Sequence, residues 1–188
     1  MLDYFTLSEN HNLNYCAEII TIDNLTKHNN ADKLQCTNIK GNTIITDLRT
    51  QLGDYVVYFP IECSIDNKIL HELSLYRDST KNKNIEKKGL FETNGRIKAV
   101  KLRGEKSEGF ILPYNEFLSV FNIELIEPKL NVLFDTFDTN PVCKKYVNQT
   151  LQISNGSNSK GNKKSKRYNI IEDQFRFHKD TEKLCNNI

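Results

Sequence analysis

Tyr55-Val56-Val57-Tyr58-Phe59 is a compact apolar run that lies between Gly53-Asp54 and Pro60. A short run of β-branched and aromatic residues bounded by turn residues predicts a β-strand. Similar short runs on either side of it predict further strands over 15–25, 34–39, 43–46, 96–102 and 109–112. Lys40-Gly41-Asn42 predicts a hairpin turn between two of them. Two short helices are expected over 69–75 and 114–121, the second from its helical spacing of apolar residues.

A few short strands and one or two helices within a single domain are typical of a small β-barrel. We therefore predict a mainly β fold, a five-stranded OB-fold barrel, with an SH3-like barrel as the alternative. Long amphipathic segments are missing, which excludes helical bundles and doubly wound sheets. The expected organisation is a polar N-terminal lead over 1–14, the barrel domain over 15–152, a basic flexible linker over 153–168, and a C-terminal segment over 169–188.

The composition limits the class of protein. Of 188 residues, 38% are hydrophobic and 27% are charged, which is polar but sufficient for an ordinary core. No apolar run approaches the length of a membrane span, and residues 1–14 are too polar for a secretory signal. The five cysteines are widely spaced, which predicts reduced thiols and a cytoplasmic location.

The charge is concentrated in two basic blocks. Residues 77–106 hold ten Lys or Arg against four Asp or Glu, and 154–168 hold five Lys or Arg without an acid. Because the net charge is only +2, the rest of the chain is acidic. Basic patches attract phosphate backbones by releasing counterions. The alternative is that 77–95, which reads as a long loop, and the linker are simply solvated.

Two segments carry the most specific pattern: His28-Asn29-Asn30-Ala31-Asp32-Lys33-Leu34 and Lys101-Leu102-Arg103-Gly104-Glu105-Lys106-Ser107-Glu108-Gly109-Phe110. Together they resemble two families. One is the tRNA-binding OB domain appended to some aminoacyl-tRNA synthetases, with H-P-N-A-D-K-L followed by R-G-x-x-S-x-G-M. The other is the N-terminal OB module of a family of ATP-dependent RNA ligases.

Three further features favour the ligase resemblance. A long insert containing Leu75-Tyr76-Arg77-Asp78 precedes Arg96-Ile-Lys-Ala-Val-Lys-Leu-Arg-Gly104. The stretches 144–147 and 175–184 are similar to segments that end the ligase OB module and lead into its catalytic domain. The sequence departs from the motifs at Asn29, where the family has proline, and at Glu108, where a small or amide residue is common.

The resemblance implies a module that grips RNA or a nicked RNA-containing duplex while a 3′-hydroxyl and a 5′-phosphate are joined. The joining requires a K-x-[DHN]-G lysine that takes AMP from ATP, and this sequence has none. We therefore expect no catalytic residues here, and assign ATP and a divalent metal to a nucleotidyltransferase domain outside this chain. The alternatives are a stand-alone binder of structured, tRNA-like RNA and a protein-docking module.

The candidate nucleic-acid contacts are basic residues of the second motif and its approach, with a serine as a phosphate donor: Arg96, Lys98, Lys101, Arg103, Lys106 and Ser107. In one continuous strand, Arg96 and Lys98 would share one face while Lys101 and Arg103 shared the other. A β-bulge near Ala99-Val100 would restore a single basic face. Arg103 has an equal claim to a structural role, in pairing with a nearby carboxylate.

Other candidates come from residue type. Tyr55 and Tyr58 are candidates for base stacking, although one face of their strand must be core. Asn30 or Asp32 is expected to organise a turn through side-chain-to-backbone bonds. Gly104 and Gly109 are expected where φ is positive or a side chain cannot fit. His28 has no second ligand at metal spacing, and no cysteine has a nearby histidine, so neither a metal site nor a thiol nucleophile is expected.

Overall fold

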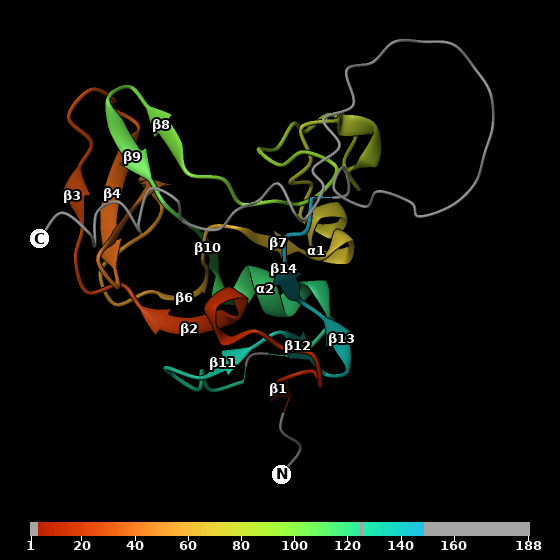
Figure 1. The fold of residues 1–188 in the computed structure, drawn as a ribbon. Helices are drawn as coiled ribbons and strands as arrows, with labels where there is room; N and C mark the ends of the chain where they lie inside the picture. Colours follow the sequence, from red (N-terminus) through yellow and green to blue (C-terminus); the bar gives the residue numbers. More distant parts are fainter. Residues whose placement is uncertain (1–3, 125, 149–188) are drawn as a thin grey trace, which may run out of the picture. The chain divides into compact units, whose positions relative to one another are not determined.

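The computed structural model describes residues 4–124 and 126–148 (Figure 1). The chain divides into two units, Met1–Asn148 and Gln149–Ile188. The predicted linker over 153–168 and the segment over 169–188 lie outside the described residues. In the part that is described, no helix is long and apolar enough to cross a membrane.

The described part is mainly β, as predicted. The two helices are α1 (Asn67–Glu72) and α2 (Tyr114–Val120), and single 3-10 turns are formed by Leu13–Tyr15 and Ser79–Lys81. The strands are β1 (Phe5–Thr6), β2 (Ala17–Thr21), β3 (Thr26–Lys27), β4 (Leu34–Ile39), β5 (Asn42–Asp47), β6 (Tyr55–Phe59), β7 (Cys63–Ile65), β8 (Val100–Leu102), β9 (Glu105–Ser107), β10 (Phe110–Pro113), β11 (Leu133–Phe134), β12 (Thr136–Phe137), β13 (Asn140–Pro141) and β14 (Cys143–Lys145).

These strands form several sheets in the described residues, where one five-stranded barrel was expected. The largest has the antiparallel order β10-β6-β2-β11, and β3-β4-β5 and the β8–β9 hairpin form two others. The sheets meet at β5, where the Glu108 amide donates to the Thr43 carbonyl at 2.8 Å. The Ile45 amide donates to the Ser107 hydroxyl at 3.0 Å. In a continuous barrel, backbone bonds alone would join β5 to β9. Here one of the connecting bonds is made by the Ser107 side chain. The remaining sheets are β1-β12-β13 and β14-β7.

Strand β6 separates two hydrophobic clusters. Its side chains alternate, so Val57 and Phe59 enter the larger cluster, which includes Phe117 of α2. Val56 and Tyr58 enter the smaller cluster, beside Ile residues of β5 and β10 and neighbouring segments. Burial on both faces explains why this strand reads as a continuous apolar run.

Part of the predicted N-terminal lead belongs to the folded unit. Phe5 is only 4% exposed and pairs with Phe137 in the β1–β12 ladder. The Ser8 amide and hydroxyl both donate to Asp135, at 2.7 and 2.5 Å. A two-residue strand is too short to show periodicity, so its burial could not be predicted from the pattern.

The helix predicted over 69–75 is shifted toward the N-terminus. It begins after Asp66, whose side chain accepts a hydrogen bond from the Lys68 amide at 2.8 Å and caps the first turn. The second helix lies where it was predicted, within one residue of its expected end.

The predicted loop over 77–95 has mostly irregular backbone, but it is held by one buried amide. The Asn82 side chain accepts from the Tyr76 amide at 2.9 Å. It also donates to the carbonyl oxygens of Tyr76 and Lys87, at 2.9 and 2.7 Å. One buried side chain therefore bonds to three backbone groups of this irregular segment, and the Tyr76 carbonyl also accepts from the Gly89 amide at 2.8 Å.

Of the strand predicted over 96–102, only Val100–Leu102 forms a strand, and the described residues show no bulge near Ala99-Val100. Arg96 forms an isolated antiparallel bridge with Ser64, and the Ile97 amide donates to the Cys63 carbonyl at 2.8 Å. Val100–Leu102 pairs instead with β9. The chain changes its pairing partner between Ile97 and Val100, which accounts for the switch in polarity that the bulge was meant to explain.

Candidate nucleic-acid interface

The two sequence motifs lie against each other. The loop that follows β3 contacts the tip of the β8–β9 hairpin, although they are more than seventy residues apart in sequence (Figure 1). The Asn30 side chain donates to the Arg103 carbonyl at 2.8 Å. The Arg103 guanidinium donates to the Asn30 carbonyl at 3.2 Å. The side chain of Asn29 also bonds to Glu105.

His28 fixes this junction from inside. Its side chain is buried, with the residue 1% exposed. Nδ1 accepts from the Asn30 amide at 3.1 Å, which leaves Nε2 to donate to the Leu102 carbonyl at 3.2 Å. The ring therefore bonds to one backbone group in each motif. This corrects the prediction for Asp32, which is exposed and lies 3.8 Å from Lys27, while Asn30 bonds across to the hairpin.

The hairpin tip depends on a glycine. Arg103 and Gly104 have φ values of 47° and 101°, the pair of positive angles that a two-residue type I′ turn requires. Gly109 also has a positive φ, of 150°, and a Cβ there would lie 2.8 Å from the Tyr58 ring. Both glycines thus have the positive φ that was expected of them.

Lys101 lies directly opposite Lys106 in the hairpin. Both side chains are exposed, and neither makes an ion pair within the described residues. Like charges at directly opposed positions destabilise an antiparallel pair. The arrangement leaves two cations on one face of a ribbon, where an anion would relieve their repulsion.

Arg96 and Lys98 each form an ion pair with a glutamate. The Arg96 guanidinium makes two bonds to Glu62, at 3.1 and 2.8 Å, and lies over the Tyr146 ring at 4.6 Å. The bond to Glu62 raises the pKa of Arg96. Lys98 lies 2.9 Å from Glu92, and this bond lowers the pKa of the Glu92 carboxyl. The structure thus brings Lys101, Arg103 and Lys106 together and gives the other two basic candidates partners elsewhere.

Ser107 and Tyr58 are parts of the interior. The Ser107 hydroxyl is buried and accepts from the Ile45 amide, so it does not face solvent as a phosphate donor would. Tyr58 is 5% exposed, and burial raises the pKa of its hydroxyl. Its ring is not accessible to a base. Tyr55, at the start of β6, is 45% exposed and keeps an accessible ring.

A pocket of about 480 Å³ lies between the two motifs. Its lining combines aliphatic and charged side chains: Ala31, Asp32, Lys33, Leu34, Leu102 and Arg103. Lys33, Leu34 and Leu102 were not among the predicted site residues. They stand inside the quoted motifs, but nothing local shows that the motifs share a cavity.

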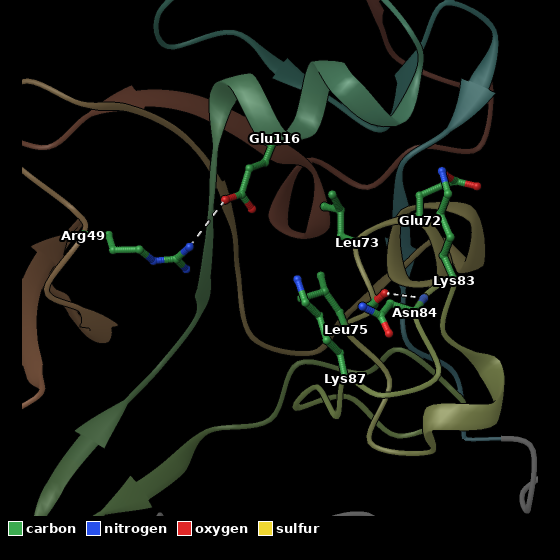
Figure 2. A pocket seen from close by; sticks show the side chains of 9 residues that line it. Arg49, Glu72, Leu73, Leu75, Lys83, Asn84, Lys87 and Glu116 are labelled. Carbon is green, nitrogen blue, oxygen red and sulfur yellow. Dashed lines mark hydrogen bonds and ion pairs between the residues drawn. The ribbon is translucent and has the colours of Figure 1, made fainter.

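A second pocket, of about 510 Å³, lies beside α1 and α2 (Figure 2). Its charges are largely compensated within its own walls. Lys83 lies 2.7 Å from Glu72, and Arg49 lies 3.9 Å from Glu116. Arg49 also pairs with Asp47 at 2.7 Å. This pocket therefore offers a polyanion less uncompensated charge than the hairpin does.

The described cysteines are free and buried. Burial raises the pKa of the Cys16 thiol to about 11, which disfavours the reactive thiolate. Within residues 4–124 and 126–148, no group of three or more His, Cys, Asp or Glu is placed to hold a metal ion.

No curated protein matches this chain. Structures of Naegleria gruberi RNA ligase are similar to it over part of its length. A form with AMP and manganese has a TM-score of 0.40 and 22% identity, covering 60% of this chain and 32% of that one. A form with ATP and manganese has a TM-score of 0.42 and 23% identity, covering 63% and 33%. The chain thus spans about a third of these ligases.

The comparison with family models is decisive for the fold. Residues 16–114 match the model of an OB-fold domain. The match covers more than half of the 188 residues and includes both motifs, β6 and the hairpin. The predicted OB fold is confirmed, and the chain belongs to this family of OB-fold domains.

Proposed function

We propose that this OB-fold domain binds RNA through the face of the β8–β9 hairpin that carries Lys101 and Lys106. The observation that carries the proposal is the direct opposition of these two lysines without an acid partner in the described residues. A purely structural ribbon would gain from an opposite charge at either position. A phosphate between the two ammonium groups stabilises both of them and releases counterions.

The position of the hairpin in the fold supports the same ligand. OB folds bind oligonucleotides with a strand face and the loops beside it. Here the hairpin tip and the loop of the first motif form one junction, held by His28 and by Asn30. Arg103, at the tip, adds a third cation whose orientation the Asn30 carbonyl restrains. The contact surface is therefore ordered before RNA arrives.

We propose further that the domain serves RNA ligation, holding RNA or a nicked RNA-containing duplex whose 3′-hydroxyl and 5′-phosphate are to be joined. This step rests on the sequence resemblance, in the paired motifs, the insert and the two stretches near the C-terminus. The chemistry belongs to a nucleotidyltransferase domain, in the same protein or a partner, which holds ATP and a divalent metal. The cytoplasmic location expected from the reduced cysteines is part of this proposal.

Titration of the chain with labelled nicked duplex, single-stranded RNA and tRNA, each at several salt concentrations, tests RNA binding. The reversal Lys101→Glu with Lys106→Glu should weaken binding strongly and reduce its salt dependence, since it removes two phosphate contacts. Each lost contact should flatten the slope of log K against log salt by about 0.7 on a single strand. Lys83→Glu with Lys98→Glu is the matched control, because it reverses the same number of charges at lysines that already pair with Glu72 and Glu92.

The outcomes separate the candidate functions. Loss of binding in the hairpin reversal but not in the control supports the proposal. A strong preference for tRNA over nicked duplex would favour the stand-alone binder of structured RNA. Equal binding by the reversal variant and the wild type would overturn the proposal and leave the protein-docking module as the function to test.

A further inference from the structure

The pocket between the motifs has an apolar wall that faces solvent. Leu102 lines the pocket and is 42% exposed, and Ala31 and Leu34 lie beside it. Because side chains alternate along β8, Leu102 projects from the face opposite to Lys101. One face of the hairpin thus carries the two lysines. The other face carries Leu102, whose side chain lines the pocket. Ligand pockets are lined mainly by apolar side chains with a few polar groups, so the exposed Leu102 side chain offers a contact for an apolar part of a ligand.

The rim of the pocket is cationic overall. Lys33 makes no ion pair in the part of the chain that the structure describes. Arg103 is anchored by one guanidinium nitrogen, which donates to the Asn30 carbonyl at 3.2 Å and leaves other N–H groups available. The single acid, Asp32, lies 3.8 Å from Lys27. The occupant therefore combines an apolar face with a negative charge.

We propose that this pocket holds one unpaired nucleobase of the bound RNA, with the adjoining phosphate at Lys33 and Arg103. Its volume of about 480 Å³ lies within the range of about 300–1,000 Å³ that is usual for small-molecule sites. The aliphatic wall receives a face of the base, and the cations receive the backbone. This inference rests on the proposed RNA binding and extends it to the side of the hairpin opposite Lys101 and Lys106.

The inference specifies which RNA is preferred. A base inside an intact duplex keeps both faces stacked on its neighbours, and unstacking it costs a few kcal/mol. A base at a frayed end or in a single strand enters the pocket without that cost. The domain should therefore bind single-stranded or frayed RNA more tightly than a blunt duplex of the same length.

Leu102→Ser tests the pocket, and Val100→Ser is its matched control. Val100 lies on the same face of the same strand, is 52% exposed and does not line the pocket. Each variant is titrated with a short single-stranded RNA and with copies that carry one abasic position in turn. Leu102→Ser should weaken binding of the unmodified RNA about fivefold, and Val100→Ser should change it less than twofold. Leu102→Phe should strengthen binding, because an aromatic ring stacks better on a base.

The expected pattern is an abasic position that weakens wild-type binding but has little further effect on Leu102→Ser. Circular dichroism verifies that each variant is folded, and Leu102→Phe adds a gain that misfolding cannot imitate. If Leu102→Ser and Val100→Ser behave alike and no abasic position matters, the pocket is not a base site. In that case, loss of binding in the Lys101 and Lys106 reversal still supports RNA binding. If the wild type shows no salt-dependent RNA binding, both proposals fail.

Discussion

The two halves of the basic stretch 96–106 look alike in sequence but differ in their electrostatic surroundings. In the first half, Arg96 and Lys98 are paired with Glu62 and Glu92. In the second, Lys101 and Lys106 face each other without an acid partner in the described residues. The chain changes its strand partner between the halves. A basic residue therefore contributes to phosphate binding according to what lies across from it, not according to its place in a charged run.

The strongest test reverses one lysine in each half. Lys101→Glu should weaken RNA binding about tenfold, because it removes a phosphate contact and adds a repulsive charge. Lys98→Glu should change affinity less than twofold, because that charge already pairs with Glu92. Filter binding at low salt measures both. Equal losses would mean that the two halves act as one surface and that the distinction fails.

Arg96→Gln should affect stability and leave binding unchanged. The substitution removes two bonds to Glu62 and the stacking of Arg96 on Tyr146. We expect a Tm lower by a few degrees, measured by differential scanning calorimetry, and an unchanged Kd for RNA. A variant that binds RNA weakly at its normal Tm would show that Arg96 contacts the ligand directly.

Lys106→Glu alone should change stability and affinity in opposite directions. It places an acid opposite Lys101, so the hairpin should gain about 0.2–1 kcal/mol. The same change removes a phosphate contact and should weaken RNA binding. Urea denaturation and RNA titration of the same preparation measure the two effects. Loss of stability would contradict the repulsion between the two lysines that is argued above.

The smallest effect should appear in acid. The bond to Lys98 lowers the pKa of Glu92 below its ordinary value of 4.5. A carboxyl whose pKa is lowered in the folded state stabilises the protein above the unfolded pKa, and this contribution is lost as pH falls through the folded pKa. The stability of the wild type and of Glu92→Gln should therefore converge below pH 4.5. A constant difference across that range would mean that Glu92 acts through something other than its charge.

The fold could be predicted because its strands carry local signals. Leu34–Ile39 and Asn42–Asp47 flank Lys40-Gly41, and the hairpin is found where the turn residues predicted it. Tyr55–Phe59 is likewise a strand with both faces buried. Each of these elements is specified by residues within a few positions of one another.

The site was predictable only in part, because its geometry depends on distant partners. The glycine turns and the two motifs could be recognised in the sequence. The carboxylate that binds Arg96 belongs to Glu62, thirty-four positions away, and could not be. The burial of Tyr58 depends on Gly109, just before β10, and on Ile44 of β5. The pocket forms only because the two motifs are in contact, and no local sequence pattern predicts that contact.

The junction between the motifs has a consequence for how the protein is made. Its hydrogen bonds join residues that are 73 to 76 positions apart, so they cannot form until most of the domain has been synthesised. Contacts of such long sequence separation form slowly and late in folding. A nascent chain that has emerged from the ribosome only as far as β6 has the first motif but no hairpin for it to hold. The capacity to capture RNA should therefore arise near the end of folding, which protects unfinished chains from binding the RNA around them.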